Sequence, residues 1–443
     1  MACQNEKIQW LHSQIQDWVR LGIIDAACGE SIGNLYPPQK PSRSWAMLIF
    51  SGLGAVIIGL GVILLFAYNW DKMGKFAKLG VVFGSLILTY LIGISLFVRS
   101  QQFKGIGEAL CLLGTMLFGA GIWLVAQIYH IEEHFPNAFL FWGIGAFLMA
   151  WAMPSVIQAS LAAVLFALFA IMEGSEFRTA VPYVFIFLLL LLPLAYKKQS
   201  WFLLAVILLS AACSILFMVV SFHHSAMIVF YSLLCIFTLY IAVGLLHQKN
   251  AKFEKFSTVY CFIGMAGYLL MLFILSFDEV SREILDHPLS LKIDVVFYWL
   301  TPFVFSIVLW LGVIREVFKK TLVKYYSHDL LLMPILLVFL CSYSLSITRC
   351  FDWPVIAAFN LIFLIHCLMM MAKGCMDVKL SRVIVGSLLL AALVVARFFD
   401  FFESLAVRGA VFVVVGVLIF SQGFFYIKSK KKKALQENKC ENS

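Results

Sequence analysis

Two histidines and a carboxylate with spacing suited to metal binding lie at residues 127–137. His130 and His134 are four residues apart, so on a helix they would share one face, and Glu133 stands between them. Imidazoles and carboxylates are zinc ligands, and a carboxylate beside a bound metal can act as a general base. Pro136 disfavours helix at the residue before it, so we expect the helix to end near this point.

The same stretch also fits a polar cap at a membrane surface. Tyr129 and Trp142 are aromatic residues of the kind that gather at membrane–water interfaces. No second histidine cluster with matching spacing supplies a third ligand. We therefore favour the polar cap, and keep a metal site at His130, Glu133 and His134, or proton or substrate handling there, as alternatives.

Other polar groups stand near the ends of apolar runs. Glu108 lies early in one run, and Arg397 and Asp400 lie three residues apart among phenylalanines. A charge this close to hydrocarbon is usually paired or faces the interior of a helix bundle. We expect Arg397 and Asp400 to form an internal ion pair, with substrate binding as the alternative. With Gln127 and Tyr129, these residues are our candidates for lining a solute or ion path.

A further polar motif, Asn69-Trp70-Asp71, ends the first apolar run. Trp70 suits the membrane interface, while Asn69 and Asp71 can cap or turn the chain there.

The composition shows which elements must position these residues. Of 443 residues, 63% are hydrophobic and 13% are charged, and the mean hydropathy is +0.96. A soluble domain has about half apolar and about a quarter charged residues. The composition therefore excludes a cytosolic enzyme, a nucleic-acid binder and a disordered chain, and predicts an all-α, polytopic bundle of membrane helices.

A spanning helix needs about 20 mostly apolar residues. Pro154 and Ser155 alone separate the fourth and fifth predicted segments, which could form a tight hairpin or one long kinked helix. We predict 14 transmembrane helices, at 46–68, 77–98, 106–128, 138–153, 156–172, 181–196, 201–221, 225–247, 257–276, 295–314, 330–347, 353–372, 381–397 and 406–427.

The basic residues orient these segments, because short cytoplasmic loops carry an excess of lysine and arginine. With the N-terminus inside, 24 of the 33 basic residues fall inside and 9 outside. We therefore expect both termini in the cytoplasm, which puts His130 and His134 on the outer side. With three further histidines and several carboxylates there, an outward site that senses pH or binds a cation is a hypothesis, although plain loop solvation is favoured.

The two ends of the chain differ from the apolar middle, 46–427. Residues 1–45 read as a cytoplasmic helical hairpin with a proline-rich link, which could bind a protein partner or rest on the membrane. Residues 428–443 form a basic cytoplasmic tail, in which Lys428–Lys433 would attract anionic lipid. Nucleic-acid binding is the disfavoured alternative for this lysine run.

Small residues four apart predict close helix contacts at Gly80 with Gly84 and at Thr115 with Gly119. Ala55 has the same spacing from Gly59 in the first segment. Most of the 11 cysteines lie in apolar runs, where packing explains them. The chain has no GxSxG, Walker or HExxH motif and no evident cofactor site, so an enzyme is not favoured.

Three runs resemble a known family. The hairpin residues 18–24, the run 66–71 that ends in Asn69-Trp70-Asp71, and the run 119–131 resemble the bacterial membrane family called domain of unknown function 2157. The likeness covers roughly residues 1–150, and the run 397–400 is similar to the end of related proteins. It implies a bacterial inner-membrane protein, brings no catalytic residue, and directs attention to Asn69, Asp71, Gln127, Tyr129 and His130.

Three functions remain open from the sequence. The first is transporter-like movement of a small solute, ion or lipid. The second is a membrane-embedded metal protein or enzyme built on His130, Glu133 and His134. The third is a scaffold or sensor whose N-terminal hairpin binds a cytoplasmic partner.

Overall fold

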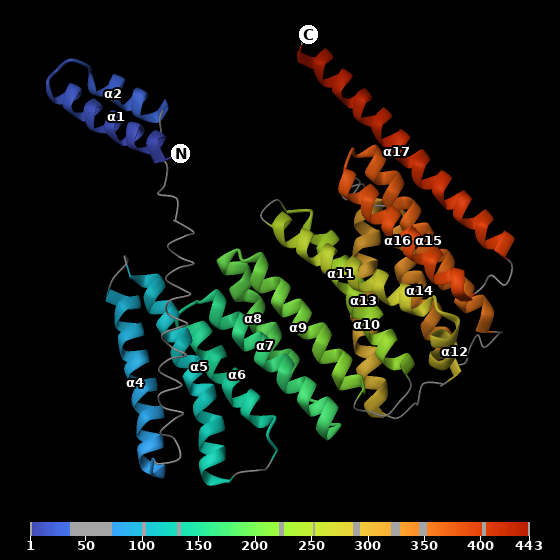
Figure 1. Ribbon diagram of the computed structural model, residues 1–443, viewed down its shortest axis with the longest axis horizontal. Coiled ribbons are helices and arrows are strands. Elements are labelled where there is room, and N and C mark those ends of the chain that lie inside the picture. The colour runs from blue at the N-terminus through green and yellow to red at the C-terminus, as the bar shows by residue number, and fades with distance from the viewer. Residues whose placement is uncertain are drawn as a thin grey trace. The chain divides into compact units, whose positions relative to one another are not determined.

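Every regular element that the structure describes is a helix (Figure 1). In this computed structural model the described residues are 2–35, 73–99, 103–130, 134–220, 226–250, 253–286, 293–319, 328–344, 352–400 and 405–441. They divide into two compact units, Met1–Val81 and Val82–Ser443. The N-terminal helices are α1 (Ala2–Arg20) and α2 (Ala26–Leu35). The remaining helices are α4 (Lys75–Arg99), α5 (Lys104–Tyr129), α6 (Asn137–Ala152), α7 (Val156–Met172), the π-helical turn η2 (Glu173–Phe177), α8 (Val184–Lys198), α9 (Trp201–Val220), α10 (Ala226–His247), α11 (Glu254–Leu275), α12 (Asp278–Asp286), α13 (Ile293–Phe318), the 3₁₀ turn η4 (His328–Leu331), α14 (Leu332–Ser344), α15 (Asp352–Met376), α16 (Leu380–Asp400) and α17 (Leu405–Glu441).

The first unit contains the expected helical hairpin. Gly22, with φ of +69°, follows the end of α1 and lets the chain turn toward α2. Gly29 of α2 lies against Val19 and Ile15 of α1, where a larger side chain would meet both. Ile15 is buried in this contact, so each helix of the hairpin covers the apolar face of the other.

The chain is a multi-pass membrane protein. Eight described helices are long and apolar enough to cross a bilayer, within Lys75–Arg99, Lys104–Tyr129, Val156–Phe177, Ile228–His247, Glu254–Leu275, Leu300–Phe318, Val355–Met376 and Val413–Lys431. Shorter apolar helices occur at Asn137–Ala152, Trp201–Phe217, Asp329–Ser342 and Leu380–Ala396. Each of the predicted segments after the first coincides with a helix, and the first, 46–68, lies outside the described residues.

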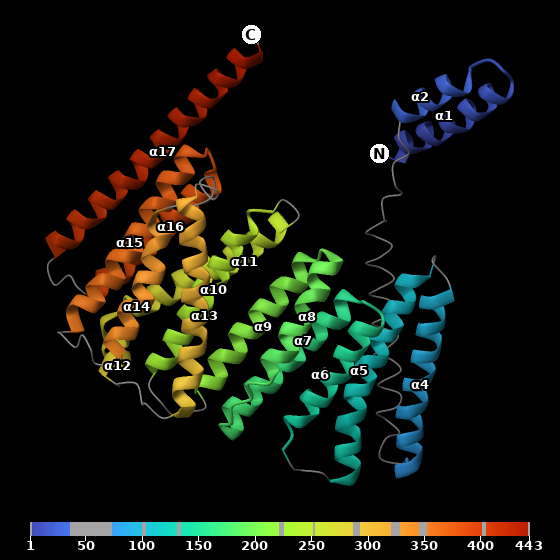
Figure 2. The ribbon, with the colours of Figure 1, turned by 180° about the vertical axis from the view of Figure 1, so that it is seen from behind.

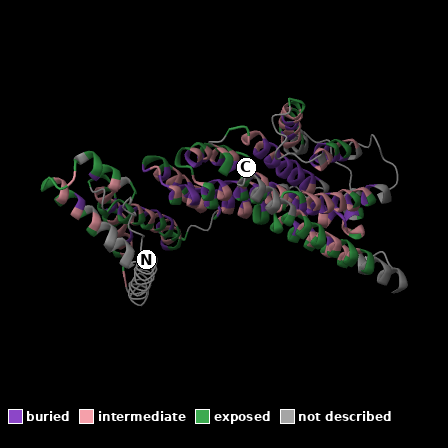
Figure 3. Cartoon of the chain, turned by 90° about the horizontal axis from the view of Figure 1, so that it is seen from above, coloured by how far each residue is buried: buried purple, intermediate pink, exposed green. Residues whose placement is uncertain are grey.

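Helix packing in the second unit buries a continuous core. The close pairs are α6 with α7, α10 with α11 and α13, and α15 with α16. α15, α16 and α17 lie side by side in both ribbon views (Figure 1, Figure 2). Many of the buried residues belong to α7, α9, α10 and α11, whereas the described apolar window of α17 is exposed. Figure 3 shows the burial of each described residue along the chain.

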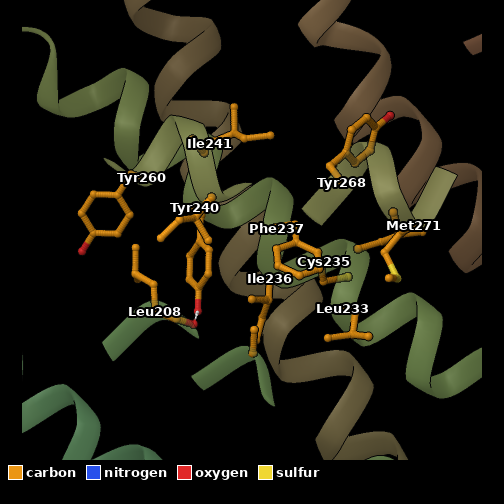
Figure 4. Close-up of a cluster of buried hydrophobic side chains, with 14 of the residues drawn as sticks. Leu208, Leu233, Cys235, Ile236, Phe237, Tyr240, Ile241, Tyr260, Tyr268 and Met271 are labelled. Carbon is orange, nitrogen blue, oxygen red and sulfur yellow. Dashed lines mark hydrogen bonds between the residues drawn. The ribbon is translucent and has the colours of Figure 1, made fainter. Parts of the chain in front are cut away.

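The centre of this core is apolar with a few buried hydroxyl groups (Figure 4). Tyr240 of α10 donates a hydrogen bond to the carbonyl of Leu208 in α9, at 3.0 Å. Tyr260 and Tyr268, both on α11, lie on different sides of the cluster. Their hydroxyl groups therefore belong to different polar neighbourhoods.

Several features of the sequence prediction are sharpened or corrected. The fourth and fifth segments form a hairpin, because α6 ends at Ala152 and α7 begins at Val156 after a cap by Ser155. The expected loop 277–294 contains a helix, α12, in its first half. The expected tail from 428 onward continues α17 as helix to Glu441, since nothing in this lysine-rich run breaks a helix.

Glycines bring α4 and α5 together, but not those expected. Gly93 lies against Cys111, and Gly107 lies against the backbone of Phe97, so both positions need the absence of a side chain. No described atom lies within 4 Å of a Cβ built on Gly80 or Gly84. A contact of this pair with the first segment, including Ala55 and Gly59, would fall outside the described residues.

Candidate functional site: polar groups buried between the membrane helices

A hydrogen-bond network centred on Thr115 joins α4, α5 and α7. The Thr115 hydroxyl donates to the carbonyl of Cys111, at 3.0 Å, one turn earlier in α5. Its oxygen is then free to accept from the Tyr90 hydroxyl at 2.9 Å and from Gln158 Nε2 at 3.0 Å. Thr115 is therefore fully hydrogen-bonded although it is completely buried.

Trp142 of α6 joins the same network from the other side. Its indole Nε1 donates to the carbonyl of Thr115, at 2.8 Å. The ring lies so close to Gly119 that any side chain there would overlap it. The predicted Thr115–Gly119 spacing thus forms a helix contact, and Trp142 serves that contact rather than the interfacial role expected for it.

Glu108 lies at the edge of this network. Its Oε1 accepts a hydrogen bond from Ser155 Oγ at 2.5 Å, and Ser155 Oγ also accepts from the backbone N–H of Gln158 at 3.3 Å. Ser155 thus caps α7 and holds the carboxylate of Glu108 at the same time. The side chain of Gln158 is fully buried, and its Oε1 has no hydrogen-bond partner among the described residues.

His130 and His134 do not share a helical face, because α5 ends at Tyr129. His130 adopts a left-handed conformation, with φ of +53°, and closes the helix. His130 is exposed, whereas His134 Nε2 lies 2.5 Å from Oε1 of Glu173. The carboxylate next to His134 therefore comes from 39 residues away in the chain, and Glu133 lies outside the described residues.

Glu173 is a buried carboxylate at the end of α7, in the π-helical turn η2. The side chain of Glu173 is 4% exposed and that of His134 is 38% exposed, so the histidine separates the carboxylate from solvent. The Thr179 hydroxyl donates to the other oxygen of Glu173, and the Phe177 ring contacts the His134 ring in a tilted arrangement, at 4.1 Å between ring centroids. Both carboxylate oxygens of Glu173 are thus partnered.

The most deeply buried ionisable pair is His366 of α15 with Asp329 of η4. His366 Nδ1 lies 2.9 Å from Asp329 Oδ2, and the two side chains are 2% and 8% exposed. The Tyr268 ring of α11 meets the imidazole edge-on, at 5.5 Å between centroids. His366 Nε2 and the Tyr268 hydroxyl have no hydrogen-bond partner among the described residues.

His366 lies well inside the apolar layer. It is ten residues from the end of the apolar span Val355–Met376, which is about 15 Å of helix. Asp329 reaches it because η4 and the short helix α14 begin beside this part of α15. Sequence reasoning missed the pair, since its members are 37 residues apart. His366 is a single polar residue in an apolar run, and Asp329 lies in the polar stretch just before another such run.

The structure does not bring the predicted path residues together. Glu108 and Gln127 are at opposite ends of α5, 19 residues or about 28 Å apart. Gln127 and Tyr129 are exposed on α5. Arg397 and Asp400 occupy the last turn of α16, where the structure does not describe the side chains, so their ion pair stays a prediction.

Two other predicted motifs have limited structural support. The motif Asn69-Trp70-Asp71 lies outside the described residues. Among the described residues, no three His, Cys, Asp or Glu side chains are grouped so that they could hold a metal ion. The metal site at His130, Glu133 and His134 stays a hypothesis, with His134 engaged by Glu173.

Comparison with known proteins finds a family match over part of the chain and no activity. No curated protein and no solved structure matches the chain. The family match ends at residue 159, so it contains the Thr115 network and excludes Glu173 and the His366–Asp329 pair. Residues 16–159 match the family described as predicted membrane protein, DUF2157, as the sequence resemblance implied.

Proposed function

We propose that this membrane protein moves a small solute or ion across the bilayer, and that the His366–Asp329 pair lies on its path. The pair itself carries the proposal. Ionisable side chains inside membrane segments are rare and costly, and they commonly mark solute pathways or proton relays. Here a buried histidine is oriented by a carboxylate and still presents one ring nitrogen that no described residue hydrogen-bonds.

Packing alone is a poor explanation for this pair. A buried ion pair is often no more stabilising than apolar residues of the same volume. In the Thr115 network, by contrast, hydroxyl, indole and carbonyl groups satisfy one another and act as polar contacts between helices. Glu108 remains a second candidate for the path, because its carboxylate is only partly buried at the end of α5.

Transport can be tested in vesicles by electrical measurement. The purified full chain is reconstituted, and solid-supported membranes record transient currents after concentration jumps of amino acids, sugars, nucleosides, organic acids and inorganic ions, each with and without a pH gradient. We expect at least one class to give currents that are lost in His366→Gln but kept in Gln127→Ala, which is exposed on α5. Absence of current and of pH-driven flux with every class would refute transport.

We further propose 14 spans with both termini in the cytoplasm of a bacterial inner membrane. The basic residues support this orientation, since 24 of 33 fall on the inner side. Cys28 is an exposed free thiol in α2, which makes it a native probe of the N-terminal side. A membrane-impermeant maleimide should label it in lysed but not in intact cells, with Cys28→Ser as the control. Labelling in intact cells would reverse the orientation.

A scaffold or sensor role is the second candidate, and the N-terminal hairpin favours it. Trp10, Leu21, Ile23 and Leu35 are large apolar side chains that stay exposed on α1, α2 and their connection. A partner protein or the lipid surface would remove them from water. Co-purification of the full chain and of a chain without residues 1–40 tests this role. A partner lost only with the truncation supports it, and identical partner sets refute it.

Lys428–Lys433, on the last part of α17, would hold anionic lipid at the inner face. Native mass spectrometry should show anionic lipid retained by the wild type and released from a chain with glutamine at these lysines. Equal retention would contradict the lipid role.

The alternative function is a metal protein built on His130, Glu133 and His134. It requires that the purified chain contain metal and that His134→Ala lose this metal.

A further inference from the structure

We infer that His366 Nε2 is a proton-binding site, so that the ion moved or co-transported by this protein is a proton. The inference deepens the proposed transport function and rests on it for its role, although the binding itself can be measured without transport. It comes from three observations on one site: the Asp329 contact, the ring nitrogen that has no hydrogen-bond partner among the described residues, and the edge-on contact with the buried ring of Tyr268.

The Asp329 contact decides which ring nitrogen is available. A carboxylate oxygen is an acceptor, so His366 Nδ1 must donate the hydrogen of their 2.9 Å contact. In the neutral ring the proton is then on Nδ1, and Nε2 carries a lone pair. That lone pair is the atom that can take up a further proton, and the carboxylate on the opposite nitrogen stabilises the imidazolium that results.

Tyr268 provides the neighbouring hydroxyl. Its side chain is fully buried, it meets the His366 ring edge-on, and its hydroxyl has no partner among the described residues. A small molecule such as water can donate to the neutral nitrogen and can accept from the protonated one. The same molecule can bond to a tyrosine hydroxyl at the same time. The site therefore suits a proton rather than an anion, because the Asp329 carboxylate adjoins the imidazole.

The surrounding charges fit a site that gains and loses one positive charge. Asp329 comes from η4, Tyr268 from α11, and Lys373 lies two turns further along α15, within electrostatic range of Asp329. Arg382 and Asp377 are also within electrostatic range of Lys373, so two carboxylates and two basic groups accompany the imidazole. In the uptake step, a hydronium O–H bond breaks, a bond to His366 Nε2 forms, and water is left.

Solid-state ¹⁵N NMR of the full chain in lipid vesicles tests the inference. The chain is labelled at its nine histidines, and the His366 signals are assigned by their loss in His366→Gln. We expect Nδ1 to be protonated throughout pH 5–9, while Nε2 is unprotonated at high pH and gains its proton as the pH falls. In Asp329→Asn the signals of both ring nitrogens should shift, because the carboxylate no longer accepts from Nδ1.

Tyrosine variants give a matched control. Tyr268→Phe should change the Nε2 signal of His366, whereas Tyr240→Phe should leave it unchanged, since the Tyr240 hydroxyl already bonds to Leu208. The inference is overturned if Nε2 keeps one protonation state from pH 5 to 9 in the folded wild type. It is also overturned if Nδ1 is the nitrogen that lacks a proton at high pH.

The two proposals can fail separately. If His366 binds a proton but the chain gives no transport currents, the proton site stands and the transport function is refuted. If currents occur but do not depend on pH and persist in His366→Gln, the transport function stands and its path does not include His366. Thermal unfolding of each variant shows whether it is folded. If His366→Gln does not fold, the separate variants Asp329→Asn and Tyr268→Phe still test the proton site.

Discussion

Gly119→Ala is expected to destabilise the protein through a single steric conflict. The new Cβ would overlap the Trp142 indole, which lies across Gly119 and donates through Nε1 to the carbonyl of Thr115 at 2.8 Å. The indole is held between α5 and α6, so it cannot swing away without breaking that hydrogen bond. The substitution therefore forces α5 and α6 apart or displaces Trp142.

The expected cost follows from three terms. Overpacking a well-packed contact costs about 1–3 kcal/mol, and the lost indole hydrogen bond adds about 0.5–1.5 kcal/mol. Alanine is a better helix former than glycine, which returns up to about 1 kcal/mol. We therefore expect Gly119→Ala to lower the free energy of unfolding by about 0.5–3.5 kcal/mol.

Unfolding of the purified chain in mixed micelles, by titration with a denaturing detergent, measures this free energy. Gly416→Ala in α17 is the matched control, since no described atom lies within 4 Å of a Cβ there. The conflict requires Trp142, so Gly119→Ala should cost nothing in a Trp142→Ala background. A cost equal to that of Gly416→Ala, or one that persists without the indole, would refute this account of the contact.

Three further predictions use the same measurement. His134→Ala should lower the free energy of unfolding by about 1–3 kcal/mol, because it removes a partner from the buried Glu173 carboxylate. In a Glu173→Leu background the same substitution should cost much less. Equal costs in both backgrounds would contradict the pairing. Gln158→Leu should change the free energy of unfolding by less than about 1 kcal/mol, since the lost hydrogen bond to Thr115 is offset by removal of Oε1, which has no partner among the described residues. Gln158→Glu should lower the free energy of unfolding by more. The reverse order would show that Oε1 is hydrogen-bonded. Lys249→Ala should lower the free energy of unfolding by less than about 1 kcal/mol, because the 2.8 Å contact of Lys249 with Glu316 is partly exposed. A larger loss that added salt does not reduce would contradict this.

Most of the helices could be predicted from the sequence because a membrane helix is specified locally. A run of about 20 apolar residues must be helical in lipid, where each backbone group needs an internal partner. The end of α7 and the start of α8 are less regular, because the π-helical turn at Glu173–Phe177 depends on tertiary contacts of Glu173 with His134 and Thr179. α12 was missed because its apolar residues are too few to stand out beside the membrane segments.

The candidate sites were harder to predict, because each is made from segments that are distant in the chain. Spacing pointed to His130 and Glu133 as partners of His134, but the left-handed turn at His130 ends α5 and leaves His134 near Glu173. Spacing also identified Thr115 and Gly119 as a contact, and it could not identify Trp142 as the residue that fills it. Pairing across helices depends on rotation and depth, which a single apolar segment does not specify.

The hydrogen bonding of Thr115 differs from that of His366. At Thr115 the hydroxyl and the carbonyl are both bonded within the protein, which is what packing requires. At His366 one ring nitrogen is bonded to Asp329, while the other nitrogen and the hydroxyl of Tyr268, whose ring contacts the imidazole, have no hydrogen-bond partner in the described part of the chain. Packing gains nothing from two unpartnered polar atoms in one buried site, because each costs about 1–3 kcal/mol. A cost of that size at a site shared by α11, α15 and the start of α14 is better explained by something that binds there.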